Sequence, residues 1–266
     1  MNAPGGVGLE RRSGGIAWLR IVRPQRRNAL SAAMWRRFHA CVDDVASDAA
    51  IRALVVTGTS DAFVSGADIV DFASFVGASD GVAYEEIVAG ALDALERLPI
   101  VTIAAIAGAC TGGGAILACA CDLRIGAASA RVGVPIARTV GNMTTAANVA
   151  RLAAVVGRPR VLQWLLTARL DDAESALAAG FFNELHDTYD DVVTRAEELG
   201  RDIATLAPLT IASVKELARR MLAATVANVA DRDLIERCYA SADFVEGVRA
   251  FAAKRPAIFF GDSTRA

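Results

Sequence analysis

The feature that most constrains this chain is the uncharged run over residues 100–121, which three consecutive glycines interrupt at positions 112–114. The run has the length of a membrane-spanning helix. Adjacent glycines would weaken such a helix, and Asp122 follows the run directly. We therefore favour a buried strand over residues 100–107, a tight turn, and a short buried helix over residues 114–121.

The turn at these glycines has the chemistry of an anion site. A glycine lets a backbone N–H approach a ligand without an intervening Cβ atom. The first N–H groups of a helix have no partner inside the helix and lie at the positive end of its dipole. The turn therefore predicts a cradle for an anion or for an oxyanion that develops during a reaction.

Sequence patterns of short strands and helices alternate along the rest of the chain. The apolar patterns predict strands over residues 15–22, 51–58, 100–107 and 123–127, and helices over residues 31–46, 84–98, 146–156, 161–166 and 172–179. Ser31 is the expected N-cap of the first helix, and residues 1–8 are expected to form a loose tail. The helical pattern from residue 192 onward favours an α/β core over residues 1–195 and a helical region over residues 196–266.

Composition and charge narrow the class of protein. Hydrophobic residues make up 54% of the chain and charged residues 22%, which is typical of a well-packed globular protein. The formal net charge of −2 argues against a general nucleic-acid-binding protein. The five cysteines are interpreted as reduced core residues, and residues 1–8 lack the pattern of a secretory signal. We therefore expect a cytoplasmic protein with no membrane and no nucleic-acid partner.

Four motifs follow one another along the chain. Residues 24–30 read Pro-Gln-Arg-Arg-Asn-Ala-Leu, and residues 62–69 read Ala-Phe-Val-Ser-Gly-Ala-Asp-Ile. The glycine turn of residues 108–114, with the helix end at residues 121–122, comes third, and residues 246–256 read Glu-Gly-Val-Arg-Ala-Phe-Ala-Ala-Lys-Arg-Pro. Together these motifs resemble the crotonase family, the enoyl-CoA hydratase/isomerase superfamily. The resemblance implies an α/β spiral of ββα units with a C-terminal helical trimerisation region, assembled as a homotrimer or a dimer of trimers.

The resemblance also implies a substrate and the groups that bind it. The substrate would be an acyl-CoA, so coenzyme A would enter as part of the substrate, with no separate cofactor and no metal. The backbone amides of Ala67 and Gly113 would form an oxyanion hole for the thioester carbonyl. Guanidinium groups suit phosphate, and the residues implied to bind the coenzyme A moiety are Arg26, Arg27, Asp68, Ile69, Val70 and Lys254.

The chain departs from the family at the proton-transfer positions. Hydratases of the family hold and activate water with two glutamates, which would fall here at Ile116 and Ile136. Isoleucine cannot transfer a proton. The segment after Ile136 carries Arg138, Thr139 and Asn142 instead, on a loop expected to border the acyl pocket. These groups are candidates for orienting water or a carboxylate, and ordinary turn capping is the alternative.

Three functions remain open at this point. The first is a hydratase- or isomerase-like enzyme with a non-standard proton-transfer set. The second is another reaction of the family, such as decarboxylation of a malonyl-type CoA or thioester hydrolysis. The third is an acyl-CoA-binding protein without catalysis. A Ser-His-Asp triad, a zinc site and a dinucleotide fingerprint are disfavoured, because the chain has only two histidines and lacks the required spacings.

Overall fold

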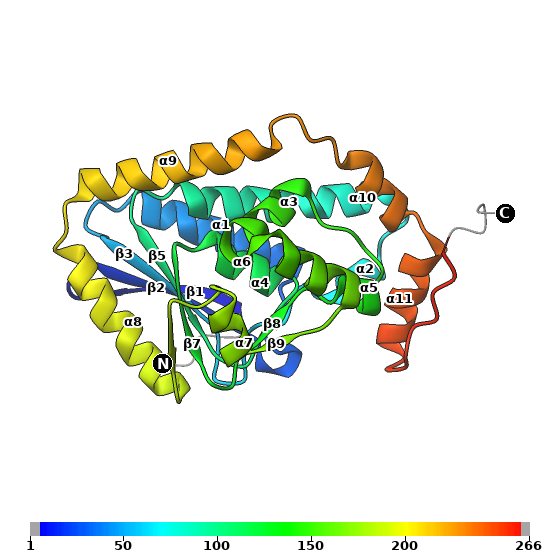
Figure 1. Cartoon of the computed structure of the whole chain (residues 1–266), viewed down its shortest axis with the longest axis horizontal. Helices are drawn as coiled ribbons and strands as arrows, with labels where there is room; N and C mark the ends of the chain where they lie inside the picture. Colours follow the sequence, from blue (N-terminus) through cyan, green and yellow to red (C-terminus); the bar gives the residue numbers. More distant parts are fainter. Residues whose placement is uncertain (1–5, 262–266) are drawn as a thin grey trace.

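The computed structural model describes residues 6–261, which form two β-sheets surrounded by helices (Figure 1). The larger sheet has the strand order β1 (Gly6–Arg12), β2 (Ile16–Val22), β3 (Ala53–Thr57), β5 (Val101–Ile106), β7 (Leu123–Ala127) and β10 (Glu184–His186). The smaller sheet has the order β4 (Ala62–Val64), β6 (Ala109–Thr111), β8 (Arg131–Gly133) and β9 (Asp171–Asp172).

The helices follow the strands in a regular sequence. They are the 3₁₀ turn η1 (Pro24–Arg26), α1 (Ala32–Ala46), α2 (Ile69–Phe72), α3 (Ala78–Arg97), α4 (Gly113–Ala120), α5 (Ile136–Thr139), α6 (Ala146–Thr167), α7 (Ala173–Ala178), α8 (Tyr189–Ala204), α9 (Pro208–Val226), α10 (Arg232–Tyr239) and α11 (Ala242–Ala252). No helix among these described residues has both the length and the apolar character needed to cross a membrane.

Consecutive strands alternate between the two sheets. The pairs β3 and β4, β5 and β6, and β7 and β8 each place one strand in the larger sheet and the next in the smaller one. Each pair is followed by helix: α2 and α3, then α4, then α5 and α6. This repetition is the expected spiral of ββα units, and it brings the start of α4 to the end of β6 as the glycine turn predicts.

The inner strands of the larger sheet are buried on both faces. Ile16 and Trp18 face the layer formed by α8, while Ala17 and Leu19 face the main core with α1 and α3. This two-residue alternation is the normal consequence of the strand pleat. Strands covered on both sides need apolar residues at every position, which explains the uncharged run of the sequence.

Several expected boundaries change in the structure. α3 begins at Ala78, six residues before the expected start, and its N-cap Gly77 has extended backbone angles. Residues 6–8 belong to β1 instead of a loose tail, whereas residues 1–5 lie outside the described part. The expected helices 146–156 and 161–166 form α6 with a break at Gly157, whose φ is +74°. The expected division at residue 195 falls within α8.

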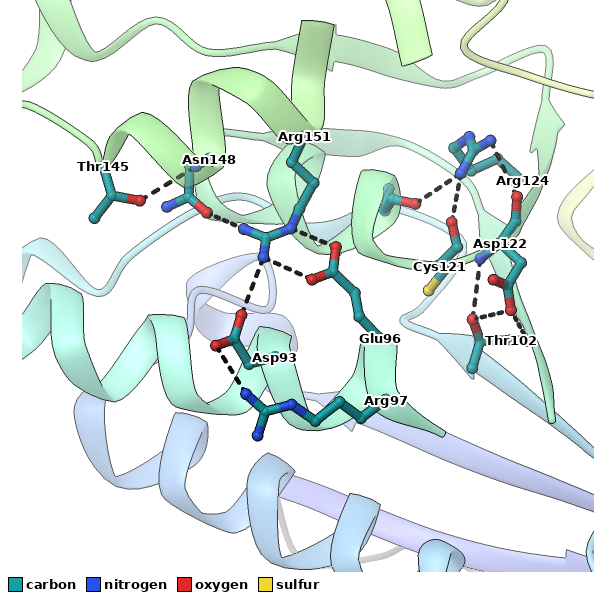
Figure 2. Close-up of polar contacts among 11 residues, drawn as sticks. Asp93, Glu96, Arg97, Thr102, Cys121, Asp122, Arg124, Thr145, Asn148 and Arg151 are labelled. Carbon is teal, nitrogen blue, oxygen red and sulfur yellow. Dashed lines mark hydrogen bonds and ion pairs between the residues drawn. The ribbon is translucent and has the colours of Figure 1, made fainter. Parts of the chain in front are cut away.

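Buried ion pairs and hydrogen bonds connect the helices behind the glycine turn (Figure 2). Arg151 of α6 is 4% exposed and donates to both carboxylate oxygens of Glu96 on α3, at 2.6 and 2.8 Å. Arg124 donates at 2.7 Å to the carbonyl of Cys121, beyond the last turn of α4. A cation at a helix C-terminus pairs with carbonyls that have no partner inside the helix. The C-terminal end of α4 is therefore capped by Arg124.

Gly114 tests the close contact between α4 and β4. An added Cβ atom would overlap the carbonyl oxygen of Val64, which belongs to the backbone and cannot move aside cheaply. We expect Gly114→Ala to lower the free energy of unfolding by about 1–3 kcal/mol in urea titrations, although alanine favours helix.

The matched control is Gly90→Ala on α3, where the new Cβ would meet only His39 atoms at 3.7 Å or more. There we expect a gain of up to about 1 kcal/mol from helix propensity. Equal stabilisation by the two substitutions would contradict the close approach at Gly114.

Candidate active site

Two backbone turns meet at the end of the smaller sheet. One follows β4 and contains Gly66 and Ala67, and the other joins β6 to α4 and contains Gly112 and Gly113. A Cβ atom on Gly112 would lie 3.6 Å from the Cα atom of Gly66, so the two turns are in direct contact. Gly66 and Gly112 have φ values of +116° and +55°, which glycine adopts without strain.

The amides of Ala67 and Gly113 are both free. Neither N–H donates a hydrogen bond within the part of the chain that the structure describes. Gly113 is the first residue of α4, so its N–H has no partner inside the helix. Both residues line one cavity, which is the arrangement expected of an oxyanion hole.

The first sequence motif supports the Ala67 turn from behind. Asn28 is fully buried and its side-chain amide donates to the carbonyl of Ala62 at 2.6 Å. The backbone of Leu30 exchanges hydrogen bonds with Gly66 and Asp68 on either side of Ala67. The Asp68 side chain accepts from Arg23 at 2.6 Å and from the amide of Val70 at 3.2 Å. These contacts aim the Ala67 N–H away from the motif and into the cavity.

The cavity has a volume of about 190 Å³ and a mostly apolar wall. Ile116 from α4 and Ile136 from α5 both line it. These are the positions at which the resemblance places the two glutamates of the hydratases. Trp35 of α1 and Phe251 of α11 also reach it, although neither was singled out in the sequence. The indole N–H of Trp35 is buried without an acceptor in the described part of the chain.

The three polar candidates after Ile136 have different positions. Thr139 and Asn142 line the cavity, and the Thr139 hydroxyl donates to the carbonyl of Pro135 at 3.2 Å. Arg138 is exposed on α5 and is not among the cavity-lining residues. The segment was expected to be a loop, but residues 136–139 form one helical turn that directs Arg138 outward and Thr139 inward.

A buried carboxyl group that sequence reasoning missed lies in the same wall. Glu85 of α3 is 6% exposed and lines the cavity, and its Oε1 accepts a hydrogen bond from the Tyr239 hydroxyl at 2.9 Å. Tyr239 in turn accepts from Nδ2 of Asn142 at 3.1 Å. Asn142 Oδ1 is buried and has no donor in the described residues. One available signal was the position of Glu85 on the apolar stripe that includes Val88 and Leu92.

Burial sets the ionisation of Glu85. Desolvation is the largest effect and raises the pKa of this carboxyl from 4.5 to about 7, against the opposing effect of the Tyr239 hydrogen bond. The charge of Asp231 raises the pKa further. A carboxyl group with a pKa near neutrality can both accept and return a proton.

The residues implied to bind coenzyme A are divided between surface and interior. Arg26 and Arg27 are exposed at η1, and the carbonyl of Arg27 accepts from the amide of Ser65, two residues before Ala67. Ile69 lines the cavity and Val70 is 48% exposed beside it. Lys254 is exposed past the end of α11. Asp68 is 5% exposed and already paired with Arg23, so its observed role is structural.

Neither histidine lines the cavity. His39 lies on α1 at 3.8 Å from Asp43, and His186 lies at the end of β10 at 3.4 Å from Glu184. Four cysteines are buried and Cys238 is partly buried, and none forms a disulfide. Among residues 6–261 no cluster of three or more acidic, histidine or cysteine side chains has the geometry to hold a metal ion.

The chain is similar to known proteins over most of its length. Residues 11–262 match the sequence profile of the family described as enoyl-CoA hydratase/isomerase. A probable enoyl-CoA hydratase of Bacillus subtilis is 30% identical over 249 residues, which cover 93% of this chain and 96% of that protein. The human mitochondrial Delta(3,5)-Delta(2,4)-dienoyl-CoA isomerase is 30% identical over 75% of this chain and 64% of that protein.

The fold comparison agrees with the sequence comparison. The crystal structure of an enoyl-CoA hydratase/carnithine racemase from Magnetospirillum magneticum superposes with a TM-score of 0.79 and 32% identity. The match covers 98% of this chain and 97% of that structure. The ββα spiral and both glycine-containing turns therefore belong to a fold shared along the full chain.

The raised pKa of Glu85 predicts a pH-dependent stability. Folding takes up a proton between about pH 4.5 and 7, so the contribution of Glu85 is lost as the pH rises through this range. Glu85→Gln keeps an acceptor for Tyr239 but does not titrate. In urea titrations we expect the variant to gain about 3 kcal/mol relative to the native protein between pH 4.5 and 8.

Glu86→Gln is the control, because Glu86 is the next residue on α3 and is exposed. Its stability difference from the native protein should stay flat over the same range. A flat difference for Glu85→Gln as well would show that Glu85 ionises normally in the folded protein.

Proposed function

Because this chain belongs to the enoyl-CoA hydratase/isomerase family, we propose that it is an enzyme acting on an acyl-CoA thioester. The thioester carbonyl oxygen binds between the amides of Ala67 and Gly113, and the enzyme stabilises the enolate that forms from it. The observation that carries this proposal is the pair of unpaired backbone amides facing one apolar cavity. Coenzyme A takes part only as a portion of the substrate.

The amides favour the enolate over the bound thioester. Negative charge develops on the carbonyl oxygen when a proton leaves the neighbouring carbon, and two fixed N–H donors stabilise that charge without reorganisation. The dipole of α4 adds to the effect at Gly113, because its positive end faces the oxygen. Apolar side chains such as Ile116 and Ile136 exclude water and strengthen both hydrogen bonds.

The coenzyme A moiety extends from the cavity toward η1. The exposed Arg26 and Arg27 lie on a turn whose backbone carbonyls accept hydrogen bonds from Ser65, two residues before Ala67. Ile69 and Val70 continue the same edge. We assign these four residues to binding the phosphates and the adenine end, with Lys254 as a further cation.

Replacing the Gly113 amide tests the oxyanion hole. Proline at the first residue of a helix is tolerated, but it has no N–H to donate. We expect Gly113→Pro to weaken the binding of an acyl-CoA analogue whose nitronate mimics the enolate by about 10²–10³-fold, measured by calorimetry. An unchanged affinity in a folded Gly113→Pro variant would remove Gly113 from the site.

Gly113→Ala is the matched control, because it keeps the N–H. A Cβ atom there meets only Cζ2 of Trp35 at 3.5 Å, which is an ordinary contact. Its affinity for the analogue should remain within a few-fold of that of the native protein.

We also propose that the protein assembles as a homotrimer or a dimer of trimers through its C-terminal helices. α9 crosses the outside of the molecule (Figure 1) and exposes Leu209, Leu217 and Met221, with exposed fractions of 81%, 61% and 65%. A groove between α6 and α9 is lined mainly by apolar residues, Met221 among them. Apolar surface of this extent on a soluble chain is typical of an interface.

Sedimentation of the purified protein is expected to show a trimer or hexamer. Met221→Glu introduces a charge into this apolar surface and should shift the distribution toward monomer. Val76→Glu is the control, because Val76 is 96% exposed between α2 and α3, away from the α6–α9 groove. A native protein that is monomeric at micromolar concentration would contradict the assembly.

A further inference from the structure

We propose that the hydroxyl group of Thr144 donates a hydrogen bond to the acyl part of the ligand, and that Asn148 fixes the direction of this hydroxyl. The inference rests on the proposed function, because it assumes that the acyl group of a thioester occupies the cavity. It goes further by assigning a specificity-determining residue, Thr144, and a positioning residue, Asn148. Neither residue was singled out in the sequence.

Thr144 and Asn148 lie in the cavity wall at the start of α6. Both line the cavity that Ala67 and Gly113 also line, and their exposed fractions are 5% and 1%. Thr145 is the N-cap of α6, and its side chain accepts a hydrogen bond from the Asn148 amide at 3.2 Å. Because this cap stabilises the first turn of the helix, the two side chains have fixed places in the wall.

Arg151 determines which way the side-chain amide of Asn148 faces. Its Nη1 atom donates to Oδ1 of Asn148 at 2.5 Å (Figure 2). A guanidinium group has donors and no acceptor, so the atom of Asn148 that faces it has to be the oxygen. The amide nitrogen Nδ2 is therefore on the other branch of the side chain, where it donates to Oγ1 of Thr144 at 2.9 Å.

Two carboxylates hold Arg151 in this position. Glu96 of α3 accepts from Nε and Nη2 of Arg151 at 2.6 and 2.8 Å, and Asp93 accepts from Nη2 at 3.3 Å (Figure 2). This pairing leaves Nη1 for Asn148. Because a guanidinium group stays charged in proteins, its hydrogen bond to Asn148 is charge-assisted and stronger than a bond between neutral groups.

The hydroxyl of Thr144 is left with a proton to donate. Its oxygen accepts from Asn148, and within the described part of the chain it donates to no acceptor. The other threonines that line the cavity differ in this respect, because the hydroxyls of Thr111 and Thr139 donate to backbone carbonyls at 2.9 and 3.2 Å. Among the threonines of the wall, Thr144 is therefore the one with a proton available to a ligand.

A hydroxyl proton in an apolar cavity discriminates between ligands. Ile116 and Ile136 in the same wall offer no acceptor, and a donor that is removed from water without a partner costs free energy. An acyl group with an oxygen atom within reach of Thr144 makes the hydrogen bond, whereas a hydrocarbon group of the same shape leaves the proton unpaired. The cavity is therefore expected to favour acyl groups that carry an acceptor oxygen over plain hydrocarbon chains of equal length.

The experiment compares coenzyme A thioesters that have the same shape. Methoxyacetyl-CoA differs from butyryl-CoA, and 3-methoxypropanoyl-CoA from pentanoyl-CoA, only by an ether oxygen in place of one methylene group. An ether oxygen accepts hydrogen bonds and donates none, and these saturated chains have no double bond to react. Calorimetry gives the affinity of each thioester, and the ratio of the affinities within a pair is the oxygen preference.

Thr144→Val removes the hydroxyl and keeps the shape of the side chain. We expect it to lower the oxygen preference by about 5–30-fold in at least one pair, whereas Thr144→Ser, which retains a hydroxyl, should keep the preference. Thr139→Val is the matched control, because it removes from the same wall a hydroxyl whose proton already goes to Pro135. Its oxygen preference should equal that of the native protein.

Asn148→Asp tests the direction of the Thr144 hydroxyl. The substitution places an acceptor oxygen where Nδ2 now donates, so the Thr144 hydroxyl turns and donates to that carboxylate. We expect Asn148→Asp to lose as much oxygen preference as Thr144→Val, although the hydroxyl is still present. The double variant should lose no more than either single variant, because both substitutions remove the same hydrogen bond to the ligand.

Arg151→Lys tests the contact behind Asn148. The substitution keeps the positive charge, but an ammonium group does not reproduce the planar fork that contacts Glu96 and Asn148 together. The oxygen preference should therefore fall. Arg160→Lys is the control on the same helix, because Arg160 pairs with Asp171 at 3.2 Å and is not among the cavity-lining residues.

The outcomes separate this inference from the proposed function. If the native protein binds none of the thioesters, the proposed function itself fails. If it binds them and Thr144→Val leaves the oxygen preference unchanged in both pairs, the role of Thr144 is overturned. A native-like preference in Asn148→Asp overturns the positioning role of Asn148, also where Thr144→Val does not fold. Because the preference is a ratio measured on folded protein, a general loss of stability does not change it.

Discussion

The contact between the two turns of the smaller sheet is the constraint on which the rest of the structure depends. The two turns are in contact, and α4 approaches β4 so closely that a Cβ atom at Gly114 would overlap the carbonyl oxygen of Val64. This distance is available only to bare backbone. It leaves the amides of Ala67 and Gly113 without internal acceptors and directs both into one cavity. The ββα spiral is the means by which segments some 45 residues apart reach this arrangement.

The same cavity also contains a carboxyl group surrounded by apolar side chains, which is unfavourable when the group is charged. Burial of Glu85 costs free energy whenever the group is charged, and the cost appears as a pKa raised to about 7. For stability alone, leucine would be a better residue than glutamate at this position of the apolar stripe of α3. The hydrogen bond from Tyr239 offsets part of the cost and fixes the direction of the carboxyl group. The two unpaired amides of Ala67 and Gly113 and this carboxyl group therefore line one cavity.

The outer helices contribute residues to the candidate site as well as to the surface of the molecule. α10 supplies Tyr239, and α11 supplies Phe251 to the cavity wall, so the helical C-terminal region is part of the site within a single chain. α9 packs on α3 and α6 but leaves much of its apolar surface exposed. The buried pair of Arg151 and Glu96 holds α6 against α3 behind the cavity (Figure 2). The site is therefore built on helices that pack against one another.

The sequence by itself determined the features that depend on local order. The uncharged run, the three glycines and the motif around Ala67 were sufficient to predict the buried strand, the turn, the short helix and the family of the fold. The resemblance also placed the two glutamates of the hydratases at Ile116, counted from the glycine turn, and at Ile136, after the proline of the next strand, and both positions line the cavity. The start of α3 was misjudged, since Gly77 and the residues after it carry a weak helix signal. Only the tertiary structure decided that Arg138 points outward while Asn142 points to the cavity, and that Glu85 joins Tyr239 across more than 150 residues. Such a pairing has no periodicity or spacing, because it arises from the packing of α10 on α3, which the folded chain alone defines.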